Sequence, residues 1–168
     1  MAVEVPVEVR VPVSDPFVLD TSRVEQLGVG PWVLFERMEF VDPVYRGRPG
    51  GPTVTLAFAA AGDHFVELIE QHDPHPSIYR ECRGALHHVG LTSTDLDADV
   101  RRYEAAGVRC AFRANFAFGG GCAYLDTLDT LGMFTELVEM TPPLQGMLAG
   151  MQAASRNWNR RDYTFSFE

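Results

Sequence analysis

Three side chains that can bind a divalent cation or carry a proton lie inside apolar stretches of the sequence. Glu67 lies in HFVELIEQ, His88 in LHHVGLTST and Glu136 in MFTELVEM. A neutral imidazole and an ionised carboxylate both offer lone pairs to a divalent ion, and a carboxylate can also act as a general base. A strand acid within an apolar run faces either water or a group that compensates its burial. These residues therefore indicate a metal-assisted proton-transfer site, or else solvated strand faces.

The two halves of the chain repeat one another, which favours the first interpretation. FVELIE, which contains Glu67, matches FTELVE, which contains Glu136, at four of six positions. His88 and Glu8 each lie seven residues before an aspartate that begins a predicted helix. Internal repeats place corresponding residues at corresponding positions of the fold. The repeat thus marks four equivalent positions, which are Glu8, Glu67, His88 and Glu136.

Each of the four residues also has a purely structural interpretation. Strand glutamates commonly lie on solvated faces, and a strand histidine is often a hydrogen-bonded core residue. Glu8 lies near the start of the chain, two residues from Arg10, which could simply pair with neighbouring acids. The occurrence of Glu67, His88 and Glu136 together in repeated register favours ligands over three separate explanations.

The elements that must position these residues follow a βαβββ order, first in a module over residues 3–72. Strict alternation of valine with polar residues predicts a strand over residues 3–13. Pro16 at the first helical position and Gly28 as the terminator predict a helix between them. Three further strands are predicted over residues 33–40, 53–62 and 64–71, separated by turn-rich segments.

The same order recurs in a second module over residues 84–140. A strand over residues 86–94 leads to Asp95, the predicted N-cap of a helix that stops at Gly107. Three strands are predicted over residues 108–114, 121–127 and 133–140, with turns between them. We therefore predict an α+β fold in which residues 1–168 form one domain of two βαβββ modules.

The linker and the tail have patterns of their own. His72, Asp73 and His75 lie in a proline-rich linker, residues 70–81, and are predicted to form a solvated loop rather than a chelating site. In the tail, residues 141–168, Leu144, Met147, Leu148 and Met151 share one helical face after two prolines. This pattern predicts a C-terminal helix that packs against the sheets or, alternatively, covers the binding site or a partner subunit.

Composition excludes several classes of function. The net charge of −9 repels phosphate backbones, and there is no basic stripe, so we expect no nucleic-acid partner. No run of apolar residues is long enough to span a membrane, and the first residues lack the pattern of a signal peptide. The three cysteines show no metal-type spacing and indicate reduced thiols. We therefore expect a cytoplasmic protein without membrane contact.

The order LHHVGLTSTDLDADVRRYEAAGV followed by FTELVE, with GVGPWVLFE and HFVELIEQ in the first half, resembles the vicinal oxygen chelate superfamily, in the branch of glyoxalase I and methylmalonyl-CoA epimerase. The resemblance covers about residues 5–140. It implies paired modules that curl into a cup, a mixed sheet around a divalent metal (Mg, Mn, Co, Ni or Zn). The implied ligands are Glu8, Glu67, His88 and Glu136. Glu8 stands where similar epimerases carry His and other members Gln, which makes the ligand set net negative.

The resemblance also implies a reaction, the abstraction of a proton next to a carbonyl by a lyase, isomerase or epimerase. The metal would chelate two vicinal oxygens of a small-molecule substrate and stabilise the enolate. Glu136 and Glu67 are the expected catalytic pair, one removing and one returning the proton. Tyr124 and Arg10 are candidate substrate-binding residues, although Tyr124 also suits a core position.

A second function is compatible with the same fold. Members of the superfamily also bind antibiotics without chemistry, so the chain could be a binding protein for an antibiotic-like or apolar ligand. The intact Glu67, His88 and Glu136 favour the enzyme. A homodimer is expected in either case, because cups that expose sheet edges commonly pair.

Overall fold

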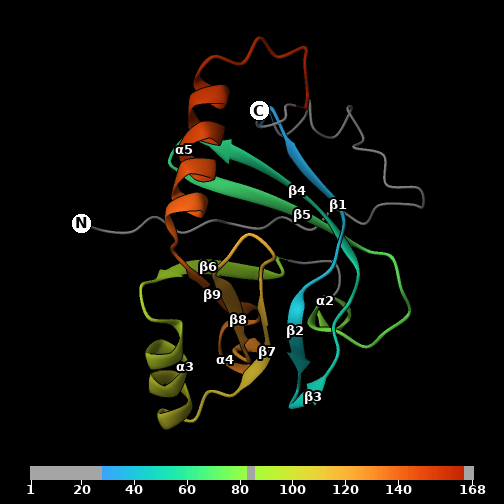
Figure 1. The fold of residues 1–168 in the computed structure, drawn as a ribbon, viewed down its shortest axis with the longest axis vertical. Coiled ribbons are helices and arrows are strands. Elements are labelled where there is room, and N and C mark those ends of the chain that lie inside the picture. The colour runs from blue at the N-terminus through green and yellow to red at the C-terminus, as the bar shows by residue number, and fades with distance from the viewer. Residues whose placement is uncertain (1–27, 83–85, 165–168) are drawn as a thin grey trace.

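Two curled β-sheets and a long C-terminal helix make up the fold of the computed structural model, which describes residues 28–82 and 86–164 (Figure 1). The strand predicted over residues 3–13, with Glu8 and Arg10, lies outside the described residues, as does the helix predicted before Gly28. The predicted α+β architecture, with a curled mixed sheet and a C-terminal helix, is confirmed.

The first sheet contains three antiparallel strands, in the order β1 (Val33–Met38), β4 (Val54–Ala61) and β5 (His64–Gln71). β4 is almost entirely apolar, because both faces of this sheet are covered. Glu67 is paired with Phe58 and lies on β5 between Phe65 and Ile69 along the same face. This face looks toward the interior of the molecule, since both apolar neighbours are buried.

The second sheet has the strand order β3-β2-β7-β8-β9-β6. Its core strands are β7 (Cys110–Asn115), β8 (Gly121–Leu125), β9 (Phe134–Glu139) and β6 (His88–Ser93). β6 pairs with β9 in parallel, with Gly90 opposite Glu136, whereas the other pairs are antiparallel. Because side chains alternate along a strand, His88 and Gly90 share a face, and Glu136 faces the same side.

The helix of the second half begins where the sequence predicts. α3 (Leu96–Ala105) follows Asp95, whose carboxylate accepts a hydrogen bond from the Ala98 amide at 2.9 Å. Leu96 and Val100 are buried against β8 and β9, so the helix covers the outer face of this sheet. The opposite face is therefore left for the interior, where His88 and Glu136 point.

One hairpin is not predicted by the sequence. β2 (Val41–Tyr45) and β3 (Arg48–Pro49) are joined by Arg46 and Gly47, whose φ values of 46° and 78° form a two-residue turn that matches the twist of the strands. β2 pairs with β7 of the other half, so the chain leaves the first sheet and extends the second. Arg46 forms ion pairs with Glu81 and, at 2.8 Å, with Asp126.

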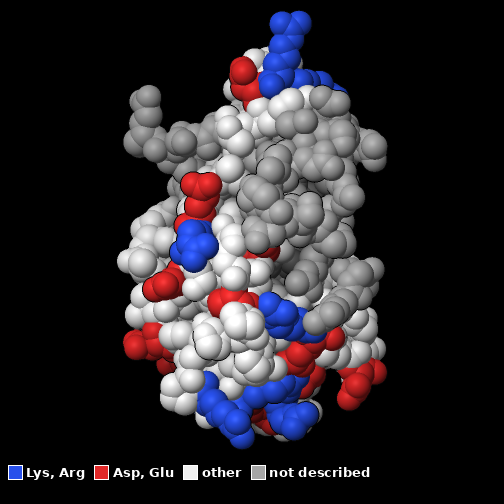
Figure 2. All heavy atoms as spheres, turned by 90° about the vertical axis from the view of Figure 1, so that its right-hand side faces the viewer, with Lys and Arg blue, Asp and Glu red and all other residues white. Residues whose placement is uncertain are grey.

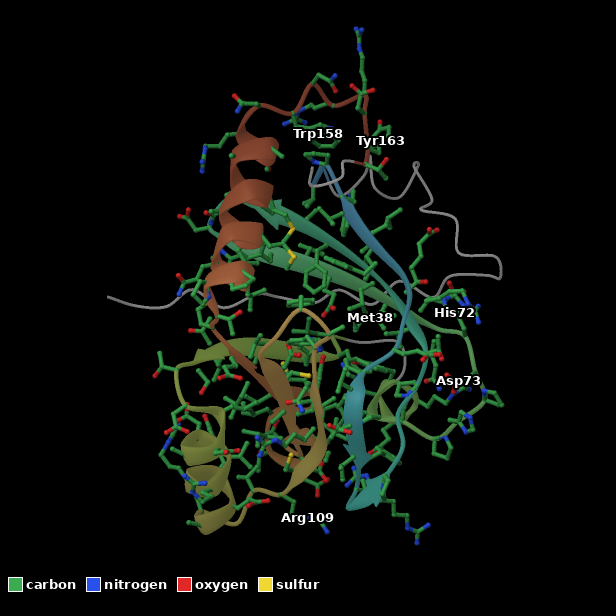
Figure 3. The ribbon with its side chains drawn as sticks, viewed as in Figure 1. Met38, His72, Asp73, Arg109, Trp158 and Tyr163 are labelled. Carbon is green, nitrogen blue, oxygen red and sulfur yellow. The ribbon has the colours of Figure 1, made fainter. Side chains whose placement is uncertain are left out.

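Two short helices lie where the sequence predicts a linker and a turn. α2 (Ile78–Glu81) buries Ile78 and Tyr79 in the core, and α4 (Leu128–Leu131) precedes β9. Before α2, His72 and Asp73 lie next to one another on the loop after β5 (Figure 3). The His72 ring nitrogen is 2.7 Å from the Thr55 hydroxyl, and Asp73 accepts backbone hydrogen bonds, so both stabilise the loop.

The predicted C-terminal helix is α5 (Pro142–Arg156), which packs along the first sheet (Figure 1). Thr141 caps its first turn, and Met151 is fully buried against Val33, Ala60 and Phe65. Beyond the helix the chain turns back toward β1, where Trp158 and Tyr163 lie close together (Figure 3). Packing against a sheet, one of the two predicted arrangements, is thus confirmed.

Surface charge and thiols agree with the composition. On the face shown in Figure 2, arginine and acidic side chains are intermixed, and the arginines that gather at its lower end have acidic side chains beside them. Cys82, Cys110 and Cys122 are free thiols, as predicted. Within residues 28–82 and 86–164, no helix is both long enough and apolar enough to cross a bilayer.

Candidate active site

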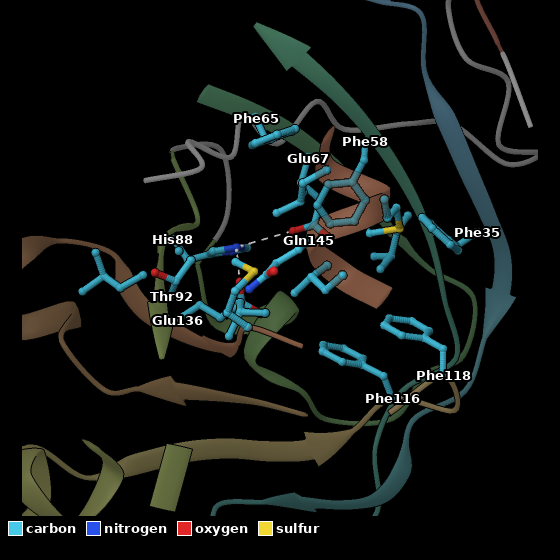
Figure 4. Close-up of a pocket in the computed structure, with 18 of the residues that line it drawn as sticks. Phe35, Phe58, Phe65, Glu67, His88, Thr92, Phe116, Phe118, Glu136 and Gln145 are labelled. Atoms are coloured by element: carbon cyan, nitrogen blue, oxygen red, sulfur yellow. Dashed lines mark ion pairs between the residues drawn. The ribbon is translucent and has the colours of Figure 1, made fainter. Parts of the chain in front are cut away.

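Three of the predicted residues meet in the interior between the two sheets. The His88 Nε2 atom of β6 is 3.4 Å from the Glu67 Oε2 atom of β5 and 3.3 Å from the Glu136 Oε2 atom of β9 (Figure 4). The residues are only 5%, 2% and 8% exposed, in the order Glu67, His88 and Glu136. Two carboxylates this deeply buried need positive charge or hydrogen-bond donors to compensate them. Either a protonated imidazole of His88 or a cation bound by all three groups would supply that compensation.

The neighbouring histidine controls how His88 presents its ring. His87 is fully buried, and its Nε2 atom lies 3.1 Å from the Ile78 carbonyl oxygen, which can only accept a hydrogen bond. The Nε2 atom of His87 therefore donates. If the Nδ1 atom of His87 carries no proton, it accepts a hydrogen bond from the His88 Nδ1 atom at 3.0 Å. With its Nδ1 proton engaged in this way, His88 faces both carboxylates through Nε2. That arrangement is common for metal-binding histidines.

The negative charge of the site also affects the hydroxyl and thiol groups around it. Tyr124 is paired with Glu136 on the adjacent strand, and burial, reinforced by the charge of Glu136, raises the pKa of Tyr124 well above its ordinary value. Burial likewise raises the pKa of Tyr79 and of Cys122. The hydroxyl of Tyr79 donates to that of Tyr124 over 3.5 Å, so Tyr124 retains a proton with which to donate in turn.

The donor set suits a divalent cation in composition and spacing. Ligands at about 2.1 Å from an ion are separated by about 3.0 Å in an octahedral shell and about 3.4 Å in a tetrahedral one. The two separations measured from His88 are close to this range. Among the described residues, however, no group of three or more His, Cys, Asp or Glu side chains is arranged so that it could hold a metal ion. Glu8, the fourth ligand that the resemblance implies, lies outside the described part of the chain.

A cavity of about 540 Å³ opens directly above the three residues. Its volume falls within the range of about 300–1,000 Å³ that is typical of small-molecule sites. β1, β4 and β5 form one wall, β6, β8 and β9 another, and the first turns of α5 a third. Figure 4 shows Glu67, His88 and Glu136 at one side of this cavity and the rings of Phe35, Phe116 and Phe118 at the other.

The structure thus brings together most of the predicted site and adds residues that the sequence did not single out. Tyr124 lines the cavity and also packs in the core, so both of its predicted roles are compatible with its position. Arg10, like Glu8, lies outside the described residues. His87 and Tyr79 were missed as supporting groups, although the doublet HH was a visible signal for His87.

Comparison with known proteins identifies the family. Residues 20–124 match the model of the glyoxalase/bleomycin resistance protein/dioxygenase superfamily. The chain belongs to this superfamily. The match includes Glu67 and His88 and ends before Glu136. The resemblance inferred from the strands with the HHVG and ELVE motifs is therefore confirmed at the level of the superfamily.

Two solved structures share the fold. A hypothetical protein from Bacillus halodurans superposes with a TM-score of 0.55 at 18% identity, over 80% of this chain and 91% of its own. Methylmalonyl-CoA epimerase from Mycobacterium tuberculosis superposes with a TM-score of 0.52 at 20% identity, over 83% of this chain and 89% of its own. No curated protein sequence is significantly similar to the chain.

Proposed function

We propose that the protein is an enzyme that removes a proton next to a carbonyl group of a small molecule with two vicinal oxygens. The observation that carries the proposal is the position of the His88 Nε2 atom between the carboxylates of Glu67 and Glu136, at 3.4 and 3.3 Å, beside a ligand-sized cavity. Buried groups of this kind are typical of sites that transfer protons. The reaction is an epimerisation if the proton returns to the same carbon, an isomerisation if it returns to another atom, and a lyase reaction if a further bond of the enolate breaks.

A divalent cation held by Glu67, His88 and Glu136, with Glu8 as the proposed fourth ligand, would act as a Lewis acid toward both substrate oxygens. Glu136 removes the proton from the adjacent carbon, and Glu67, which comes from the other sheet, returns it from the opposite side. Tyr124 donates a hydrogen bond to a substrate oxygen, because its raised pKa keeps the hydroxyl protonated. The apolar walls exclude water, which strengthens each of these interactions.

The related epimerase suggests a first substrate class, thioesters of coenzyme A, because methylmalonyl-CoA is in its name. The carbon between a thioester and a second carbonyl bears an acidic proton. The oxygens of the two carbonyl groups can chelate one ion. Arg10, which lies outside the described residues, stays a proposed substrate-binding residue from the sequence alone.

The first experiment measures bound metal and proton exchange together. Protein purified without chelator or His-tag is expected to contain close to one divalent ion per chain by elemental analysis, and to exchange the acidic carbon proton of a substrate in D₂O. His88→Ala combined with Glu136→Ala should abolish both. Glu136→Gln should lower exchange by about a hundredfold or more, the scale of a lost general base, while the protein stays folded.

Glu104→Gln is a matched control, because Glu104 is an exposed carboxylate on α3. It should leave metal content and exchange unchanged. Absence of metal from the native chain, even after reconstitution, together with no exchange for any carbon acid, would rule out the proposed reaction.

The aromatic lining of the cavity favours a second candidate, a binding protein that sequesters an apolar ligand without chemistry. Such a protein would bind its ligand equally well with and without divalent metal, and Glu136→Gln would not weaken binding. The exchange measurement separates the two functions.

A further inference from the structure

The cavity is lined by many aromatic rings, both beside the three site residues and on the opposite wall. Six phenylalanines line it, namely Phe35, Phe40, Phe58, Phe65, Phe116 and Phe118. Phe116 and Phe118 are stacked, with centroids 5.1 Å apart and planes within 6°, and Phe35 meets Phe58 edge to face at 6.2 Å. Three methionines, including Met38 and Met147, also line the cavity. Such a wall binds flat apolar groups through dispersion and desolvation.

The charges around the cavity are of one sign. Three carboxylate residues line the cavity, namely Asp63, Glu67 and Glu136. Among the described residues, no arginine lines it, and His88 is the only basic side chain that does. The chain contains no lysine, and several described arginines are held elsewhere, Arg46 by Glu81 and Arg113 by Asp97. Phosphate groups are bound in proteins mainly by arginine, lysine and backbone N–H groups. The acidic and apolar lining that the described residues give this cavity therefore favours an uncharged apolar ligand over a phosphorylated one.

We propose that the natural substrate is an uncharged, largely apolar molecule in which a carbonyl and a neighbouring oxygen are attached to a ring system, and not a coenzyme A thioester. This inference rests on the proposed function, since the vicinal oxygens are directed at Glu67, His88 and Glu136. The rings occupy the space between Phe58 and the Phe116 and Phe118 pair (Figure 4). For an α-hydroxy ketone, the proton moves from the carbinol carbon to a carboxylate and returns to either face of that carbon, so the product is the racemised substrate.

Benzoin is a suitable probe, because it is uncharged, has two phenyl rings and carries a hydroxyl next to a carbonyl. Acetoin has the same oxygens with methyl groups in place of the rings, and methylmalonyl-CoA has the charged carrier. Binding of each probe to the full chain, loaded with divalent metal, is measured by calorimetry. Turnover is followed as racemisation of (R)-benzoin and (R)-acetoin by chiral chromatography, and as deuterium uptake for all three probes. We expect benzoin to bind at least about tenfold more tightly than acetoin or methylmalonyl-CoA, the equivalent of one well-packed ring.

Two variants test the aromatic wall itself. Phe118 is 43% exposed and stands at the rim of the cavity, so Phe118→Ala should not disturb folding, and it should weaken benzoin binding about fivefold to tenfold, with acetoin unaffected. Phe116→Ala should have a larger effect in the same direction. The control is Leu131→Ala, because Leu131 is 56% exposed and lies on α4 outside the cavity.

The outcomes separate this inference from the function on which it rests. Benzoin binding that depends on Phe116 and Phe118, without racemisation or exchange of any probe, would support the apolar ligand class and contradict the enzyme. Deuterium exchange into methylmalonyl-CoA with binding at least as tight as that of benzoin would support the enzyme and overturn the apolar substrate. Failure of benzoin to bind, or binding unchanged in both phenylalanine variants, would also overturn it.

Discussion

His87 shows how one residue can control a site that it does not enter. Its ring connects the Ile78 carbonyl to His88 through two hydrogen bonds of 3.1 and 3.0 Å, and it packs among Tyr79, Tyr124 and Phe134. The result is a single orientation of the His88 ring. The role proposed for His87 is therefore positioning, with no contact to the substrate.

Replacement of His87 should weaken metal binding without removing a ligand. His87→Phe keeps a buried ring but loses the acceptor for the His88 Nδ1 proton, so we expect the metal affinity to fall about tenfold to a hundredfold. His87→Asn restores an acceptor oxygen near the former Nδ1 position and should recover part of the affinity. Chelator competition measures the affinity, and nitrogen NMR of the His88 ring reports its tautomer. An unchanged tautomer and affinity in His87→Phe would refute the positioning role.

At the scale of the element, α5 is both a structural support and a wall of the cavity. On the buried side of α5, Met151 packs against the first sheet. Residues nearer the start of the helix, such as Leu144 and Leu148, line the cavity. Displacement of the helix would therefore both expose the first sheet and open the cavity.

The stability that α5 contributes can be measured by shortening one buried side chain. Met151→Ala leaves a cavity against Val33 and Phe65, so the free energy of unfolding should fall by about 2–4 kcal/mol in urea titrations. Ala153→Ser, on the exposed side of the same helix, is the control and should change stability by less than about 0.5 kcal/mol. A loss from Met151→Ala no larger than that of the control would show that the helix is not firmly packed on the sheet.

Elements whose signals are local were predictable, and those that depend on distant partners were not. Asp95 and Gly107 delimit α3 because a cap and a terminator act on adjacent backbone groups. The joint position of Glu67, His88 and Glu136 was predictable because the chain repeats itself. β2 was missed because its pairing with β7 is specified by contacts between residues far apart in sequence. The support of His88 by His87 requires knowledge of α2, whose single turn carries little periodic pattern.

At the scale of the whole molecule, the interior holds several ionisable groups in their neutral forms. Tyr79, Tyr124 and Cys122 are buried around the site, and burial raises the pKa of each well above its ordinary value. Ionisation of these groups in place is costly, so it is coupled to opening of the fold.

The expected homodimer stays a prediction, which sedimentation velocity would test directly.

Stability should consequently decline at alkaline pH. The unfolded chain releases the protons of Tyr79 and Tyr124 near pH 10, whereas the folded chain retains them to higher pH, so their contribution is fully present below about pH 10 and is lost as the pH rises through the folded values. Of the five tyrosines, two should titrate only when the protein unfolds, as followed by phenolate absorbance. Tyr124→Phe should reduce this delayed fraction by one residue. Simultaneous titration of all five in a folded protein would contradict the expectation.

The separation of the two sheets gives the three site residues unequal freedom. His88 and Glu136 lie on hydrogen-bonded neighbours, β6 and β9, so their spacing is determined by the backbone ladder. Glu67 belongs to the other sheet, and its distance from His88 depends on how closely the two sheets pack. The site therefore consists of a stiff pair and a compliant third member. Ions of different radius, or a substrate entering between the sheets, would be accommodated by displacement of β5 relative to a pair that keeps its geometry.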